Sequence, residues 1–400
     1  MTAASIAAAQ NAEPFKLSML VYDKRYRGYF LQFLTISIFM LVVAWLISNV
    51  IQNLAALGKE FSFSFLWQPA SYDINQTLIE YTSRSPHWKA AVVGILNTMV
   101  VAVLGCILAT VVGVLIGIAR LSKNWLVSRL MTIYIEGFRN VPVLLWILLV
   151  STIVSSALPS PRQAPVLLGG LVPTNRGFYI PAPTWGDGSG WLAIIFLASL
   201  VAVFVYRKWA AKLQAETGRI LPVFWTSMAI IILPTVLMFF ILGRPVGLEI
   251  PELKGFNFQG GLYIRNSFVA LWLALSLYTA AFIAENVRAG IQAISHGQTE
   301  AAYALGLPAN RTMNLVILPQ ALRIIIPPLI SQYLNLTKNS SLAIAVGYMD
   351  VTGTLGGITL NQTGKEMECL MLLMAFYLIV SLLISAVMNI YNSAVSLKER

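Results

Sequence analysis

The sequence predicts an all-α protein that crosses a membrane about eight times. Among its 400 residues, 58% are hydrophobic and only 11% are charged, whereas a typical soluble domain has about 25% charged residues. The mean hydropathy is +0.74. The apolar residues are concentrated in runs of roughly 20 residues, the length that a helix needs to span the hydrocarbon layer. Together these observations exclude an ordinary soluble protein.

Eight apolar runs are candidate transmembrane helices. The first follows a segment that contains Glu13 and Asp23, and no small-residue cleavage site comes after it, so we expect a retained anchor and not a signal peptide. The fourth is the shortest, because its uninterrupted apolar part extends only from Trp191 to Tyr206. The fifth contains Pro234, which a membrane helix tolerates when its neighbours satisfy the freed carbonyl. The predicted spans are residues 29–51, 90–119, 131–156, 189–206, 222–242, 267–285, 324–347 and 368–392.

Basic residues predict the orientation of these spans. With the N-terminus inside the cell, the inner segments hold nearly twice as many Lys and Arg residues as the outer segments, the bias that orients inner-membrane proteins. The net charge of +11 therefore reflects topology and does not indicate nucleic-acid binding. Both termini and the segment 286–320 are then cytoplasmic, provided that the short fourth span is real. The pair Arg207-Lys208 that follows this span supports it.

The sequence has few residues that could form a catalytic, metal or nucleotide site. Cys106 and Cys369 both lie in apolar runs, and the two histidines, His87 and His296, are far apart and are expected in loops. The sequence around Lys365 lacks the first glycine of a phosphate-binding loop. We therefore expect no enzyme activity, no metal and no cofactor on this chain.

The segment between the sixth and seventh spans has the most informative pattern. The small residues Ala301 and Ala302 follow Glu300 and would let another surface approach closely. We expect Gly306 to adopt a positive φ angle and to end a first helix. We expect Pro319 to break a second helix before the chain re-enters the membrane. On composition alone, this segment could be an ordinary cytoplasmic helical hairpin.

The spacing within this segment resembles the EAA loop of bacterial ABC-import permeases. In that pattern EAA is followed by three residues, Gly, nine residues, Ile, one residue and Leu-Pro. Here Glu300, Gly306 and Pro319 take the corresponding places, and Val316 replaces Ile. So long a gapped match makes the ordinary hairpin a weak alternative. In the family the loop is the docking site of the ATPase subunit, so the resemblance implies this role for Gln298, Glu300, Ala301, Ala302, Gly306 and Pro319.

The flanking residues are similar to those of the polar amino-acid uptake branch of these permeases. Glu285 and Arg288 precede the loop as they do in that branch, and residues 338–342 resemble its Lys-x-Thr-Ser-Leu ending, with Ser340 in place of threonine. In the first half of the chain, residues 134–142 resemble the Arg-Gly-Thr-Pro signature of the same branch. We assign structural or gating roles to Glu136, Arg139, Pro142, Glu285 and Arg288.

The resemblance implies a type I importer permease fold. Its five core helices would be the second, third, sixth, seventh and eighth spans, to which this chain adds an N-terminal helix and an inserted helix pair. This long form looks like one permease of the general L-amino-acid importers. The implied parts are a cytoplasmic N-terminal segment 1–28, a first span and periplasmic segment 29–89, a first core part 90–156, an insertion with two spans 157–262, and a second core part 263–400 with the EAA loop at about 286–320.

The resemblance also implies a function. The chain would be a non-catalytic permease subunit that moves L-amino acids from a periplasmic binding protein into the cytoplasm by alternating access. Its location would be the bacterial inner membrane, with both termini in the cytoplasm. The implied partners are a related permease in a heterodimer, two ATPase subunits that bind ATP and Mg, a periplasmic amino-acid-binding protein, membrane lipid and the amino-acid substrate, but no nucleic acid.

Two basic residues lie within apolar runs, where a charge is costly and indicates function. Arg139 could pair with Glu136, one helical turn away, near the cytoplasmic edge. Lys338 lies in a polar stretch, and such a break in a spanning helix usually faces a water-filled path, although gating or helix packing is an alternative. The predicted substrate path consists of Asn335, Lys338, Asn339, Ser340 and Ser341.

Small residues recur at every fourth position of the second span, at Gly105, Ala109, Gly113 and Gly117. Such a stripe lets another membrane helix pack closely. Packing within the chain is favoured over a contact between subunits.

A stand-alone secondary transporter coupled to protons or sodium is the alternative function. It predicts acidic residues in the middle of the membrane and needs no ATPase. The deep acidic candidates, Glu136 and Asp350, both lie near the ends of predicted spans.

Overall fold

The computed structural model describes residues 18–56, 58 and 61–395. Residues 1–17 of the predicted cytoplasmic segment and the last five residues of the chain lie outside the described residues.

The chain divides into two compact units, 1–65 and 66–400. The first unit contains the short helix α2 (Met19–Tyr22) and the long helix α3 (Lys24–Ala56). Helix α3 is long and apolar enough to cross a membrane. This confirms the predicted first span. A short 3-10 helix, η1 (Ser64–Trp67), follows it at the boundary of the units.

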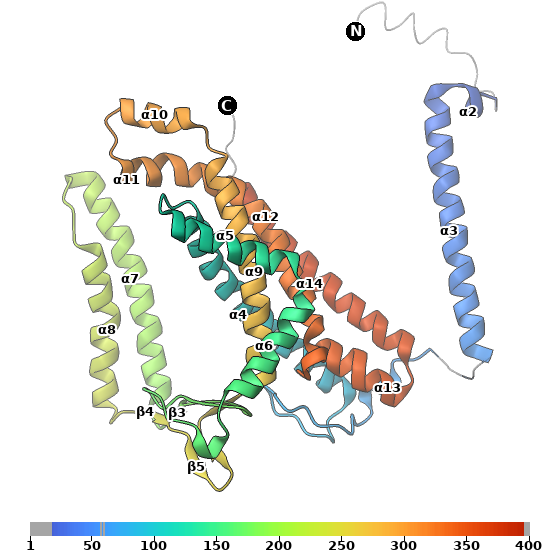
Figure 1. Ribbon diagram of the computed structural model, residues 1–400, viewed down its shortest axis with the longest axis horizontal. Helices are drawn as coiled ribbons and strands as arrows, with labels where there is room; N and C mark the ends of the chain where they lie inside the picture. Colours follow the sequence, from blue (N-terminus) through green and yellow to red (C-terminus); the bar gives the residue numbers. More distant parts are fainter. Residues whose placement is uncertain (1–17, 57, 59–60, 396–400) are drawn as a thin grey trace, which may run out of the picture. The chain divides into compact units, whose positions relative to one another are not determined.

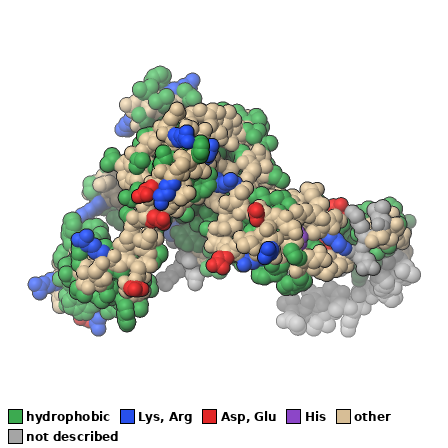
Figure 2. Space-filling view, turned by 90° about the horizontal axis from the view of Figure 1, so that it is seen from below, with side chains coloured by type: hydrophobic (Ala, Val, Ile, Leu, Met, Phe, Trp, Pro, Cys, Tyr) green, Lys and Arg blue, Asp and Glu red, His purple; other side chains and the backbone are tan. Residues whose placement is uncertain are grey.

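The second unit is mainly helical. Hydrophobic side chains are spread over the face of the protein shown in Figure 2, with scattered charges between them. Within the described residues of both units, seven helices are long and apolar enough to cross a membrane, and a bent helix pair makes eight, which confirms the predicted class. The long helices of the second unit are α4 (His87–Arg120), α5 (Trp125–Asn140), α6 (Val143–Ala157), α7 (Ser189–Thr217), α8 (Val223–Ile241), α9 (Asn266–Gln292), α12 (Leu318–Asn339) and α14 (Glu366–Val395).

Helix α9 is the centre of the core. Helices α4, α5, α6 and α12 pack against it (Figure 1). In its most apolar stretch 61% of the residues are buried, compared with 28% in α4 and none in α14. Its Leu271, Leu275 and Ile283 are among the largest fully buried side chains. The chain that follows α9 is therefore attached directly to the core.

The small-residue stripe of α4 lies against this core. A Cβ atom added at Gly113 would lie 2.7 Å from Cβ of Ile283, and one added at Gly117 would lie 2.7 Å from the carbonyl oxygen of Ala284. Both contacts are with α9, so the prediction of packing within the chain is confirmed.

We expect Gly113→Leu to separate α4 from α9, because no space exists for even one added carbon. Overpacking of this kind costs about 1–3 kcal/mol. The measurement is the thermal unfolding midpoint of the purified chain in detergent, which should fall. Gly190→Ala is the matched control, since Gly190 lies in a helix with open space around it. An unchanged midpoint for Gly113→Leu would contradict the tight contact.

The third predicted span, 131–156, is wrong as a single helix. Helices α5 and α6 meet at an angle of 109°. The break falls at Val141, which has an extended backbone (φ −109°, ψ 134°), and at Pro142, which precedes the first turn of α6. A proline disfavours the α conformation in the residue before it, so this sequence ends α5 where it does.

Helices α7 and α8 form a hairpin and confirm the fourth and fifth predicted spans as membrane-length helices. Helix α7 is longer than predicted, because it continues past Tyr206 as far as Thr217 and ends at Gly218, which has a φ angle of +70°. Pro234 lies inside α8.

The two segments that flank this hairpin, predicted to lie outside the membrane, contain strands, which the sequence did not predict. Strands β1 (Val172–Thr174), β2 (Gly177–Ile180) and β7 (Leu262–Arg265) form one antiparallel sheet. Strand β3 (Ala182–Trp185) pairs with β4 (Val246–Glu249), and β5 (Glu252–Lys254) pairs with β6 (Asn257–Gln259). A short 3-10 helix, η2 (Pro161–Gln163), precedes them. These strands connect to one end of each of α7, α8 and α9, because α7 follows β3, α8 precedes β4 and α9 follows β7.

The predicted loop positions of the two histidines are wrong. His87 is the first residue of α4 and is buried, with its Nδ1 atom 3.1 Å from the hydroxyl of Thr359. The same hydroxyl lies 2.9 Å from that of Tyr72, so the segment before α4 is joined to the C-terminal part of the core. His296 begins α10.

Candidate coupling loop and polar path

The predicted EAA loop is a helical hairpin. It consists of α10 (His296–Ala304), α11 (Ala309–Thr312) and a π-helical turn, η3 (Met313–Ile317), that leads into α12. Gly306 ends α10 with a φ angle of +76°, which confirms the predicted role. The amide of Leu307 then donates to the carbonyl of Ala302 over 3.1 Å and closes the turn.

The predicted docking residues divide into an exposed and a buried group. Glu300 lies in the middle of α10, not near its start, and is exposed together with Ala301. Ala302 is 3% exposed and therefore supports the hairpin from inside. The exposed apolar side chains Tyr303 and Leu305 lie next to these residues, and Leu305 is 82% exposed. A contiguous surface of small, apolar and acidic side chains is typical of an interface.

The predicted helix break at Pro319 is wrong. The chain is helical without interruption from Ala309 to Val346, and Pro319 lies in the first turn of α12. The π-helical turn directly before it accommodates the proline, because a wider turn relieves the clash of the ring with the preceding backbone. The side chain of Gln320 donates to the carbonyl of Val316 over 2.9 Å and to Gln298 of α10 over 3.3 Å. Gln298 thus joins the two arms of the hairpin.

An ionic cluster lies at the end of α9 from which this hairpin emerges. Glu285 accepts hydrogen bonds from Nε of Arg288 at 3.1 and 3.2 Å, which confirms the predicted link. Glu285 also pairs with Arg120 at the end of α4, a partner that the sequence did not reveal. The cluster fastens α4 to α9 next to the hairpin.

The predicted pair of Arg139 with Glu136 is wrong. The Arg139 guanidinium lies over the ring of Phe282, 5.4 Å from its centre, because α5 packs on α9 and brings the ring within reach. Glu136 instead accepts a hydrogen bond of 3.3 Å from Asn140. Glu136 and Arg139 are both exposed, and Pro142 forms the break between α5 and α6.

The residues of the predicted substrate path do not all share one face. Asn335 and Lys338 are exposed on α12, and with Ser331 they form a polar stripe at helical spacing. Within the described part of the chain, Lys338 has no ion-pair partner, so its ammonium group is available to water or to another molecule. Asn339 is half-buried at the end of the helix.

Ser340 and Ser341 bond to the end of α12 instead. Ser340 is buried and donates to the carbonyl of Thr337 over 2.7 Å, and Ser341 donates to that of Lys338 over 2.8 Å. They terminate α12 and begin the 3-10 helix η4 (Ser340–Val346).

A buried carboxylate follows η4 and was not selected from the sequence as a site residue. Asp350 precedes the π-helix η5 (Thr352–Thr359), which short helix α13 (Leu360–Thr363) continues. Asp350 is fully buried. Its Oδ1 atom accepts a hydrogen bond of 2.8 Å from the amide of Gly353, whereas its Oδ2 atom accepts none. Burial raises the pKa of this carboxyl from its ordinary value of 3.8 to about 6. Asp350 lies between the last two spans.

We expect the stability of the protein to fall as the pH rises from about 4 to this value and to level off above it. The native carboxyl binds its proton more tightly than the unfolded one, so its contribution is complete below about pH 4 and is lost as the pH rises through about 6. The unfolding free energy should decrease by an amount on the order of 3 kcal/mol. Asp350→Asn keeps an acceptor for Gly353 but cannot titrate. The unfolding midpoint of this variant in detergent should therefore not show the fall that Asp350 causes between pH 4 and 7. Parallel pH profiles for the two proteins would refute the assignment.

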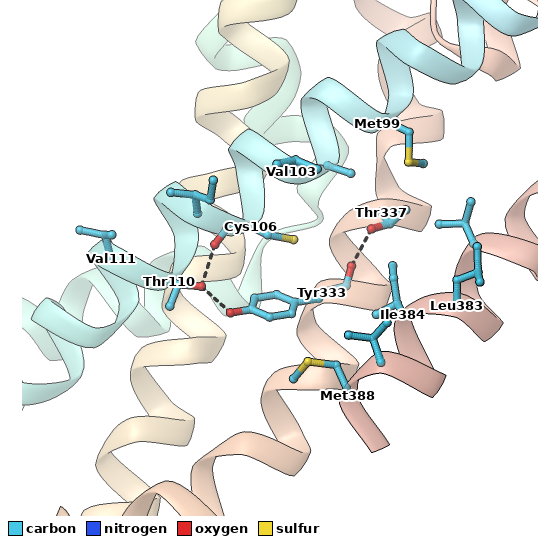
Figure 3. Close-up of a pocket in the computed structure, with 14 residues that line it drawn as sticks. Met99, Val103, Cys106, Thr110, Val111, Tyr333, Thr337, Leu383, Ile384 and Met388 are labelled. Atoms are coloured by element: carbon cyan, nitrogen blue, oxygen red, sulfur yellow. Dashed lines mark hydrogen bonds between the residues drawn. The ribbon is translucent and has the colours of Figure 1, made fainter. Parts of the chain in front are cut away.

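An apolar groove lies between α4, α12 and α14, with a volume of about 700 Å³. Figure 3 shows Met99, Cys106, Ile384 and Met388 on its walls. Its few polar atoms bond to one another, since the hydroxyls of Thr110 and Tyr333 are 2.7 Å apart. The groove contains none of the predicted path residues, and its walls suit a hydrocarbon surface, not a zwitterion. Among the described residues, no group of three His, Cys, Asp or Glu side chains could hold a metal ion.

Comparisons with known proteins agree with this architecture. Residues 194–399 match the family model described as binding-protein-dependent transport system inner membrane component. The glutamate/glutamine/aspartate/asparagine transport system permease protein BztB of Rhodobacter capsulatus is 50% identical over 96% of this chain and 97% of its own length. This chain belongs to that permease family.

Other permeases show how the long form is related to shorter ones. The general L-amino acid transport system permease protein AapQ of Rhizobium johnstonii is 45% identical over 95% of both chains. The probable glutamine permease protein GlnM of Bacillus subtilis is 40% identical over only 31% of this chain and 57% of its own. The resemblance found in the EAA loop and its flanks is thus confirmed, and the fold is that of a type I importer permease.

Proposed function

We propose that this permease is one of two membrane subunits of an ATP-driven L-amino-acid importer in the bacterial inner membrane. The observation that carries the proposal is the exposed hairpin α10–α11 between α9, the most buried helix, and α12, the helix with the polar stripe. A force on this hairpin would act on the core and on the stripe together. The names of the most similar permeases, which refer to amino-acid transport, support the substrate class.

In this proposal two ATPase subunits dock inside the cell, one of them on the hairpin. The exposed Glu300, Ala301 and Leu305 would contact the ATPase, while Gln298 and the buried Ala302 hold the hairpin rigid. Closure of the ATPases on ATP and Mg would then push α10 and reorient α9 and α12. The Glu285 cluster would carry the movement to α4. This chain itself would bind no cofactor and catalyse no reaction.

The substrate would pass along the polar stripe of α12. A charged amine in the membrane is stable only where water, a ligand or another protein contacts it, and the exposed Lys338 meets this condition. Its ammonium group could contact the carboxylate of an amino acid, and Asn335 could contact the polar backbone groups. A related, non-identical permease would supply the opposite wall of the path, and a periplasmic binding protein would deliver the substrate to the outer face.

The proposed orientation places both termini and the hairpin in the cytoplasm and the paired strands outside. Helix α9 begins directly after β7 and ends before α10, so the strands and the hairpin are at opposite ends of the core. The stand-alone ion-coupled transporter is not favoured, because the chain belongs to a binding-protein-dependent family.

Co-purification of the tagged chain from its native membrane tests the proposed assembly. Mass spectrometry of the bound subunits should find a second permease and an ATPase, in a ratio of one to two. Isolation of this chain alone, under conditions that keep a control ABC complex intact, would refute the assembly.

A further inference from the structure

The inner end of the α7–α8 hairpin has an excess of basic side chains. Arg207, Lys208, Lys212 and Arg219 are all exposed. The one acidic residue between them, Glu216, lies 3.7 Å from Lys212 in an exposed ion pair, which is a weak interaction. Four basic residues and one acidic residue leave this segment, 207–219, with three net positive charges. Among the described residues, Arg207 and Arg219 have no ion-pair partner.

The fold places this basic segment on the same side of the protein as the α10–α11 hairpin. Strand β3 precedes α7 and pairs with β4, which follows α8. Strand β3 also comes directly after β2, which pairs with β7, the strand that leads into α9. The opposite end of α7 is therefore on the side where α9 ends. In the orientation proposed above, on which this inference rests, that side is the cytoplasmic leaflet.

Helix α7 is too long for the hydrocarbon layer alone. Its 29 residues correspond to about 44 Å, whereas the hydrocarbon layer is about 30 Å thick. Its apolar run ends at Tyr206, so Arg207, Lys208 and Lys212 follow where the helix leaves the hydrocarbon layer.

Aromatic and aliphatic side chains are interleaved with the charges. Trp209, Ile220, Phe224 and Trp225 are 53–79% exposed. Trp side chains such as Trp209 and Trp225 are enriched where a protein meets the headgroup region. The Lys208 ammonium lies 4.6 Å from the centre of the Phe204 ring, so its stem runs along the apolar surface and its charge is held at the edge of that surface.

We infer that this basic segment is a binding site for the phosphate headgroups of anionic phospholipids. Guanidinium groups bind phosphate through paired hydrogen bonds, and clusters of four or more basic residues beside a membrane helix bind anionic leaflets. The α7–α8 hairpin has few other contacts that hold it in place. Helices α7 and α8 pack chiefly against each other, and only 6% of the most apolar stretch of each is buried. Lipid binding at its end would anchor it. A soluble partner such as the ATPase would not require the interleaved Trp and Phe side chains.

Retention of phosphatidylglycerol by the purified protein tests the inference. The full chain, with whatever subunits accompany it, is reconstituted in phosphatidylcholine nanodiscs that contain a minor fraction of phosphatidylglycerol. Bound lipids are counted by mass spectrometry after mild detergent release. We expect the double variant Arg207→Gln, Lys208→Gln to retain phosphatidylglycerol at least about tenfold less than the natural protein. High salt should reduce retention by the natural protein.

The matched control removes one Arg and one Lys from the outer side, at Arg84 and Lys254. The variant Arg84→Gln, Lys254→Gln should retain phosphatidylglycerol like the natural protein. Equal retention by the Arg207–Lys208 variant would overturn the inference, and loss of the ATPase with lipid retention unchanged would identify a protein contact instead. Lipid retention is read without transport, so a failure of the proposed function, seen as absence of the ATPase from every preparation, is distinguishable from a failure of this site.

Discussion

Gly306→Val should reduce amino-acid uptake by about tenfold or more without reducing the amount of permease in the membrane. Gly306 ends α10 with a φ angle of +76°, and a residue with a Cβ atom loses about 1–2 kcal/mol in this region. A valine would lose more, because its branched side chain restricts the backbone further. A free-energy change of 1.4 kcal/mol shifts an equilibrium tenfold. The population of the native hairpin, relative to its other conformations, would therefore fall about tenfold or more, and binding of the ATPase would fall with it.

Two variants separate this effect from a general loss of stability. Gly306→Asn should keep most of the uptake, because asparagine tolerates the left-handed region. Gly297→Ala, on the same hairpin, should be neutral, since Gly297 has an ordinary φ angle and its nearest neighbour would be 4.0 Å from an added Cβ. Uptake and ATPase co-purification are measured for all three. Full ATPase binding and uptake by Gly306→Val would remove the coupling role from the hairpin.

Lys338→Ala should lower uptake by about tenfold or more, with the ATPase still bound. A hydrogen bond to a charged group contributes about 1.5–3 kcal/mol, and alanine removes the ammonium group that would contact the substrate carboxylate. Lys338→Arg, which keeps the charge, should recover part of the uptake. Radiolabelled acidic and neutral amino acids are compared in membrane vesicles.

The exposed Lys254 on strand β5 provides the control for a lost positive charge. Lys254→Ala should transport normally. If Lys338→Ala changes neither the rate nor the range of amino acids carried, the polar stripe of α12 is not the substrate path.

Periodic and compositional signals in the sequence were enough to predict most of the fold. Membrane-length apolar runs gave the long helices, and the stripe of small residues in α4 gave its close contact with another helix. The bend at Val141 and Pro142 was missed, although its signal was present, because hydropathy continues across the proline. Strands β1 to β7 were missed for a different reason. Each has three or four residues, too few for a clear alternation of apolar and polar side chains. In addition, β2 pairs with β7 and β3 pairs with β4, and no local pattern records pairing between segments that are distant in the sequence.

The features of the candidate site that depend on local spacing in the sequence were predicted. The features that depend on tertiary contacts were missed. The turn at Gly306 follows from the chain itself, and so does the link from Glu285 to Arg288, three residues apart on one helix. The contact of Arg120 with Glu285 and the burial of Asp350 depend on how helices meet. The position of Arg139 over Phe282 was missed because a cation–π contact with a neighbouring helix replaced the expected local ion pair.

The most direct test of the proposed function is reconstitution. The purified permease complex, with its ATPase subunits and the periplasmic binding protein, is placed in liposomes that contain no ion gradient, and the entry of radiolabelled L-amino acids is followed. The account predicts uptake that requires ATP, the ATPase and the binding protein together, and that is lost in Gly306→Val. Uptake by this chain alone, driven by a proton or sodium gradient and indifferent to ATP, would contradict it.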